Sequence, residues 1–220
     1  MEKHIVTNYD LDLDQCKTMI GEMSIYIDKL LVDVVGLVSS KNTNLINGIF
    51  KTEEEINKLE KKLRSFTLNV LSKRQPMADD LRTVLITLKI SGILERIADH
   101  IVNITKKIDH QIKIPEYFSS KMDLEALGKL VGENFSTVIN LYKEPSNEMA
   151  KEVLRKDMLC NELFSEICKK NLDDISKSNE QKECKFFIEI NFIAKEFERI
   201  GDLVKNISKE VRYSISGKVR

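Results

Sequence analysis

Apolar residues recur at alternating steps of four and three positions along two long stretches of this 220-residue chain. One stretch runs from Ile90 to Ile108 and the other from Phe186 to Val211. This spacing lays one apolar stripe along an α-helix, because three or four residues complete about one helical turn. Such a stripe is stable only when other helices cover it. The chain is therefore predicted to fold as a bundle of long helices.

The same periodicity predicts three helices in each half of the chain. Their expected ranges are about 12–40, 44–73, 76–113, 118–142 and 147–176, with a sixth helix that includes 186–211. Connections are short, and 8 glycines and 3 prolines are too few for a fold with many turns. We expect an all-α protein of two tandem antiparallel three-helix bundles, residues 1–114 and 115–220, lying side by side.

The two halves also share polar residues, which a common helical fold does not require. Residues 95–108 read ERIADHIVNITKKI and residues 198–211 read ERIGDLVKNISKEV, with seven of fourteen positions identical. Polar surface positions exchange freely in a helix that only needs to pack. The chain is therefore interpreted as a two-fold internal repeat that carries one polar motif twice.

Helical geometry places the repeated carboxylates away from the apolar stripe. Glu95 and Asp99 lie one turn apart on a single ridge, and Glu198 and Asp202 repeat this arrangement. Two like charges at that spacing repel each other, whereas a cation over the ridge would be attracted to both. One interpretation is a cation site, and the alternative is a solvated acidic face.

The preceding helix of each half adds an acidic residue and an amide one turn apart. These pairs are Glu53 with Asn57 and Asp157 with Asn161, offset by 104 positions. Oxygen-bearing side chains that converge from two helices are suitable ligands for a hard or borderline metal ion. The pattern thus favours one metal site in each half.

Composition and missing motifs exclude several other classes of function. The 35 basic and 35 acidic residues balance, which disfavours binding to nucleic acid or to an anionic membrane. The most apolar stretch, Leu30 to Val38, is too short to span a bilayer, and the acidic N-terminus does not resemble a signal peptide. The four cysteines lack a CxxC pair and are expected to be free thiols. We expect a cytoplasmic protein.

Enzyme activity has no support in the sequence. The Glu-x-x-His pattern of di-iron bundles is missing, as are phosphate-binding glycine loops and nucleophile motifs. His100 follows Asp99 directly, and on a helix the two side chains diverge by about 100°. Because its repeat partner is Leu203, His100 is expected to be a surface residue.

Three segments together resemble the PhoU family of phosphate-signalling proteins. They are LERIAD followed by Asn103 and Ile104, FERIGD followed by Asn206 and Ile207, and SKRQPMADDLR between the second and third helices. The resemblance covers nearly the whole chain and is strongest over residues 50–110 and 150–212.

That resemblance implies two three-helix bundles that hold metal ions on acidic motifs. By position, the implied ligands are Glu53, Asn57, Glu95 and Asp99 in one site, and Asp157, Asn161, Glu198 and Asp202 in the other. Both asparagines stand where the family often has a second carboxylate. Iron is the metal implied first, and zinc, manganese and magnesium are the alternatives.

The resemblance also implies a negative regulator of phosphate uptake and of the phosphate-starvation response. Such a protein is a cytoplasmic, homodimeric adaptor between the ATPase of a phosphate ABC transporter and a sensor histidine kinase. One alternative is a metal-free helical scaffold whose acidic ridges bind a basic partner. Another is a metal-dependent hydrolase of phosphate esters.

Overall fold

The computed structural model describes the backbone of residues 2–40, 42–112 and 121–216, and the side chains of 11–40, 42–77, 80–110 and 123–213. Within these ranges all regular structure is helical. The helices are α1 (Glu2–Ser40), α2 (Asn44–Arg74), α3 (Ala78–Ile112), α4 (Lys121–Lys143), α5 (Asn147–Lys177) and α6 (Gln181–Ser216). The predicted all-α class is confirmed.

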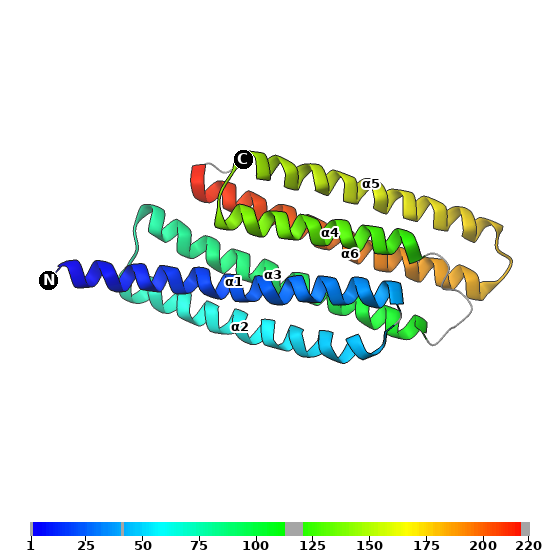
Figure 1. Cartoon of the computed structure of the whole chain (residues 1–220), viewed down its shortest axis with the longest axis horizontal. Coiled ribbons are helices and arrows are strands. Elements are labelled where there is room, and N and C mark those ends of the chain that lie inside the picture. The colour runs from blue at the N-terminus through cyan, green and yellow to red at the C-terminus, as the bar shows by residue number, and fades with distance from the viewer. Residues whose placement is uncertain (1, 41, 113–120, 217–220) are drawn as a thin grey trace.

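The six helices form two bundles that lie side by side (Figure 1). Helices α1, α2 and α3 contact one another, as do α4, α5 and α6. Between the bundles α1 contacts α4, and α3 contacts α6. Helices that are equivalent in the repeat therefore face each other across the interface, while α2 and α5 lie on opposite outer sides (Figure 1).

Apolar stripes from both bundles meet in one continuous core. Phe135 and Phe197 are among its largest fully buried side chains, and each contributes about 1.5–3 kcal/mol by burial. Gly128 allows α4 to approach this core closely. A Cβ atom at Gly128 would lie 2.8 Å from Cγ2 of Val35 and 3.1 Å from the ring of Phe197.

The observed helix ends differ from the expected ones by a few residues, except in α1. That helix begins at Glu2 rather than near residue 12. Helix α2 ends at Arg74 and is capped by Gln75, which has a left-handed backbone (φ 48°) and donates a hydrogen bond from its amide to the carbonyl of Leu71. Ser146 caps α5 by accepting a hydrogen bond from the amide of Met149. The expected boundary between residues 114 and 115 lies outside the described residues.

Two further sequence expectations concern thiols and membranes. The four cysteines are free, and Cys16 and Cys160 are buried. Among the described helices, none carries an apolar segment of the length needed to cross a bilayer.

Polar pairs join α3 to α6 across the interface between the bundles. They are Lys89 with Glu210 at 3.0 Å, His100 with Glu196 at 2.6 Å, and His110 with Glu189 at 3.7 Å. The expectation of a surface position for His100 was wrong, since its side chain is only 16% exposed. The helical wheel of α3 alone does not reveal that α6 covers this side chain.

Candidate metal sites

The first acidic cluster lies along the contact between α2 and α3. We define it as Glu53, Asn57 and Glu60 of α2 with Glu95 and Asp99 of α3. Asp99 is exposed, Glu60 is buried, and the other three are partly buried. These residues share a face because α2 and α3 are antiparallel neighbours joined by a short turn.

Glu95 experiences an excess of negative charge. Burial raises the pKa of its carboxyl group, and the charges of Asp99 and Glu60 raise that pKa further. The charges of Arg64 and Arg96 oppose this shift without cancelling it. A cation near Glu95 would relieve the repulsion.

Asn57 contributes an oxygen atom without a hydrogen-bond partner. Its Nδ2 atom donates a hydrogen bond to Oε1 of Glu53 at 2.5 Å, which fixes the orientation of the amide. Its Oδ1 atom is buried, and no donor within the described residues reaches it. Burying a carbonyl oxygen unpaired costs about 1–3 kcal/mol, so a cation ligated there would restore a lost interaction.

Sequence reasoning missed Glu60, which belongs to the same ridge as Glu53 and Asn57. Its Oε1 atom accepts hydrogen bonds from Nε and Nη2 of Arg64 at 2.9 and 2.5 Å. Its position could have revealed it, because Glu60 lies seven residues, or two helical turns, after Glu53 and therefore on the same face of the helix. In the second half the equivalent position is Phe164, so the repeat comparison did not reveal it.

The second acidic cluster consists of Asp157 and Asn161 of α5 with Glu198 and Asp202 of α6. Asp157 is buried, with 5% of the residue exposed, and the other three are partly buried. Helix α6 covers the carboxylate of Asp157, which the sequence spacing did not reveal.

Lys205 lies between the two aspartates of the second cluster, and sequence reasoning missed it too. Its Nζ atom donates to Oδ2 of Asp157 at 2.9 Å and to Oδ1 of Asp202 at 2.6 Å. Burial alone would lower the pKa of Lys205, but its hydrogen bonds and charge interactions with Asp202 and Asp157 outweigh burial and raise that pKa. Lys205 is therefore an ammonium ion at neutral pH.

Glu198 has a cationic neighbour as well. Nζ of Lys195 lies 2.6 Å from its Oε2 atom, although the two groups are not oriented as a hydrogen bond. The same ammonium group lies 5.2 Å from the centre of the Phe164 ring. Lysines therefore neutralise much of the second cluster.

The two clusters differ in their fit to a metal ion. In the described part of the chain, no three acidic, histidine or cysteine side chains already converge as a ligand set. The first cluster nevertheless offers oxygen donors, excess negative charge at Glu95 and the unpaired Oδ1 atom of Asn57, which suit a hard or borderline cation. The second cluster fits poorly, because an ammonium group already binds Asp157 and Asp202.

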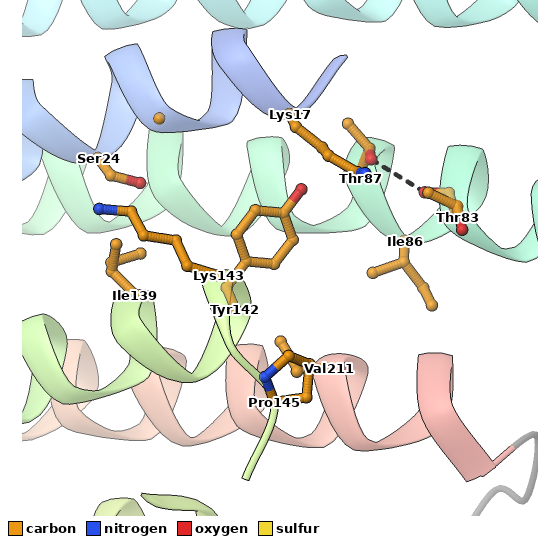
Figure 2. Close-up of a pocket in the computed structure, with 11 residues that line it drawn as sticks. Lys17, Ser24, Thr83, Ile86, Thr87, Ile139, Tyr142, Lys143, Pro145 and Val211 are labelled. Atoms are coloured by element: carbon orange, nitrogen blue, oxygen red, sulfur yellow. Dashed lines mark hydrogen bonds between the residues drawn. The ribbon is translucent and has the colours of Figure 1, made fainter. Parts of the chain in front are cut away.

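A separate cavity of about 380 Å³ lies between the bundles (Figure 2). Its described lining residues come from α1, α3, α4, α6 and the residues after α4: Lys17, Gly21, Ser24, Thr83, Ile86, Thr87, Ile139, Tyr142, Lys143, Pro145 and Val211. Burial raises the pKa of Tyr142, and its hydrogen bond with Thr87 opposes that shift. The described lining holds two ammonium groups and no carboxylate, so this cavity disfavours cations.

Comparison with known proteins identifies similar sequences over nearly the whole chain. The family model described as the PhoU domain matches twice, over residues 20–108 and 124–211. A phosphate-specific transport system accessory protein PhoU homolog from Zymomonas mobilis is 32% identical over 98% of this chain and 90% of its own length. The phosphate-specific transport system accessory protein PhoU of Escherichia coli is 22% identical over 99% of this chain and 89% of its own length.

Solved structures with the same fold are also similar to this chain. The crystal structure of PhoU from Pseudomonas aeruginosa superposes with a TM-score of 0.90, covering 96% of this chain and 100% of that one at 19% identity. The phosphate transport system regulatory protein PhoU from Streptococcus pneumoniae superposes with a TM-score of 0.85, covering 96% and 99% at 19% identity. At these identities the similarity establishes the fold.

Proposed function

Because this chain belongs to the PhoU domain family, we propose that it is a regulatory accessory protein of a phosphate transport system. The observation that carries the proposal is that both halves match the family domain. Full-length relatives named as accessory proteins of phosphate-specific transport support the same role.

The proposed role is that of a cytoplasmic negative regulator. It connects the ATPase of a phosphate ABC transporter to a sensor histidine kinase, and it restrains phosphate uptake and the starvation response when phosphate is plentiful. The protein acts by binding and catalyses no reaction. It works as a homodimer, which sedimentation of the purified chain would test.

Exposed leucines at equivalent places on the outer helices support partner binding. Leu68 of α2 is 55% exposed, and Leu172 of α5, which lies 104 positions later, is 60% exposed. Packing within this chain does not explain an apolar residue at either place. Single exposed apolar side chains are common on protein surfaces, so the support for partner binding comes from their recurrence at equivalent positions of the two halves.

A pull-down from phosphate-replete and phosphate-starved cells tests the adaptor role. The tagged chain should retain a transporter ATPase or a sensor kinase from replete cells. The double variant Leu68→Gln and Leu172→Gln should retain less of it than the control Ser65→Gln and Asn69→Gln, which changes exposed polar residues of α2. Recovery of neither protein under either condition would contradict the adaptor role.

The proposal includes a metal ion at the first acidic cluster, with iron first and zinc, manganese or magnesium as alternatives, and its candidate ligands are Glu53, Asn57, Glu95 and Asp99. The sequence also predicted a site at Asp157, Asn161, Glu198 and Asp202, but that cluster fits a metal ion poorly because Lys205 already binds Asp157 and Asp202. A bound ion would supply the positive charge that the first cluster lacks. Support comes from the raised pKa of Glu95 and from the unpaired oxygen of Asn57.

Elemental analysis of the purified chain tests the metal. Glu95→Gln combined with Asp99→Asn should lower metal content and abolish the rise in melting temperature that added Fe²⁺ produces. Partner binding that survives a chelator but weakens with salt would instead favour the metal-free scaffold.

A further inference from the structure

We propose that Lys205 is a built-in cation of the second acidic cluster, so that a metal ion binds the first cluster and is excluded from the second. This inference rests on the metal-binding part of the proposed function. It concerns the difference between the two halves of one repeat.

The contacts of Lys205 are those of a bridging cation. It reaches from α6 to Asp157 on α5 at 2.9 Å and to Asp202 on its own helix at 2.6 Å. Its side chain is 22% exposed and that of Asp157 is 8% exposed, so solvent screens their interaction only weakly. One ammonium group thus joins the two helices that were expected to share a metal ion.

The equivalent position in the first half carries no cation. Lys205 corresponds to Val102, 103 positions earlier, and Val102 is buried in the apolar core. Asp99 is exposed, and no ion pair or hydrogen bond in the described structure engages its carboxylate. The acidic residues therefore repeat between the halves, but the cation does not.

A metal ion and the Lys205 ammonium would compete for the same oxygens. Binding a divalent ion to Asp157 and Asp202 would place two cations a few ångströms apart in a partly buried site, and this repulsion is large. Displacing Lys205 would leave its ammonium group without either of its two aspartate partners. In the first cluster the neighbouring cation is Arg64, which pairs with Glu60, and no described cation pairs with Glu53, Glu95 or Asp99.

A second lysine reinforces this difference. Lys195 lies 2.6 Å from Glu198, whereas the equivalent of Lys195 in the first half is Gly92. Every carboxylate of the second cluster is thus paired with a lysine. If metal binding alters the shape of the chain, it does so through the first bundle, while the second keeps its α5–α6 contact without metal.

Reciprocal substitutions test the inference. Purified variants are loaded anaerobically with Fe²⁺, desalted, and analysed for iron per chain. Lys205→Met should raise iron content to about double by opening the second cluster. Val102→Lys, which places an ammonium group beside the first cluster, should remove most of the iron, since a lysine can extend its charged end to the surface. If Lys205→Met fails to fold, the paired deletions below still decide the matter, because they compare the two clusters with Lys205 in place.

Paired deletions complete the test. Glu198→Gln with Asp202→Asn should leave iron content unchanged, while Glu95→Gln with Asp99→Asn should abolish it. Equal losses from the two double variants, or no gain in folded Lys205→Met, would overturn the inference. An iron-free wild type with an iron-binding Lys205→Met variant would support the built-in cation while contradicting metal binding by the native first cluster. Lack of iron in both would contradict both proposals.

Discussion

Nδ1 of His100 lies 2.6 Å from Oε2 of Glu196, and this contact joins α3 to α6 across the interface between the bundles. The side chains are 16% and 12% exposed, so removing Glu196 leaves His100 largely buried without this partner, and removing His100 leaves Glu196 only its 4.0 Å contact with Arg199. This contact therefore links the stability of the two repeats.

Alanine at His100 and at Glu196 should each lower the free energy of unfolding by about 1–2 kcal/mol. The double variant should lose less than the two single losses combined, with a coupling of about 1 kcal/mol, because the pair can be broken only once. Urea unfolding at neutral pH measures these values. The control pair is Lys89 with Glu210, whose lysine is 55% exposed and whose coupling should stay under about 0.5 kcal/mol. Strict additivity for His100 and Glu196 would contradict an energetic link.

Two glycines should respond to alanine in opposite directions. Gly128→Ala should destabilise the chain by about 1–3 kcal/mol, because the new methyl group would lie 2.8 Å from Val35 and force the core to shift. Gly21→Ala should stabilise it by about 0.5–1 kcal/mol, because nothing lies within 4 Å of the added atom and a helical glycine is replaced. Gly21 lines the cavity of Figure 2. The melting temperatures of the two variants distinguish these outcomes. Equal changes in melting temperature would show that the close approach of α1 and α4 does not depend on Gly128.

Glu95→Gln should stabilise the metal-free chain at neutral pH by about 0.2–0.5 kcal/mol, the size of one repulsion between like charges one turn apart. Burial and the charges of Asp99 and Glu60 raise the pKa of Glu95 above 4.5 in the folded state. The ionised carboxylate therefore opposes folding above that folded-state pKa, and the penalty disappears as the pH falls toward 4.5 and the group takes up a proton. The urea concentrations at the unfolding midpoints of the variant and the wild type, measured across this pH range, test whether the variant is the more stable at neutral pH. The exposed control Glu162→Gln should show no such pH-dependent gain.

Cys160 should make the chain less stable in alkali. Burial, followed by the charge of Asp157, raises the pKa of its thiol from 9.0 to about 12. As the pH rises past 9.0 the unfolded chain loses this proton while the folded chain keeps it, so stability falls until the folded-state pKa is reached. Cys160→Ala should therefore lose less stability than the wild type between about pH 8 and about pH 10. Parallel profiles for the two proteins would contradict the prediction.

The long helices could be predicted because their apolar stripes are regular over many turns. Ile90 to Ile108 and Phe186 to Val211 both lie in the core as expected. The start of α1 at Glu2 was not predicted, because the first residues of the chain mix scattered apolar residues with acidic and polar ones and carry no cap that marks a helix start. Helix ends depend on capping and on contacts with other helices, and a stripe reports neither.

The candidate sites could be predicted only where the decisive contacts lie along one helix. The ridge of Glu95 and Asp99 follows from spacing alone. The pairing of Lys205 with Asp157 joins residues 48 positions apart on two helices, and the pairing of His100 with Glu196 joins residues 96 apart. Both depend on how the helices pack, which a helical wheel does not contain. Metal binding by the eight candidate ligands stays a prediction.

The most direct measurement of the regulatory role is expression of a phosphate-starvation reporter in cells that lack the gene for this chain. In phosphate-replete medium the account predicts that the reporter is switched on and that the rate of phosphate uptake rises, with both restored by the wild-type chain. A reporter that stays off in replete cells, with unchanged phosphate uptake, would contradict the account.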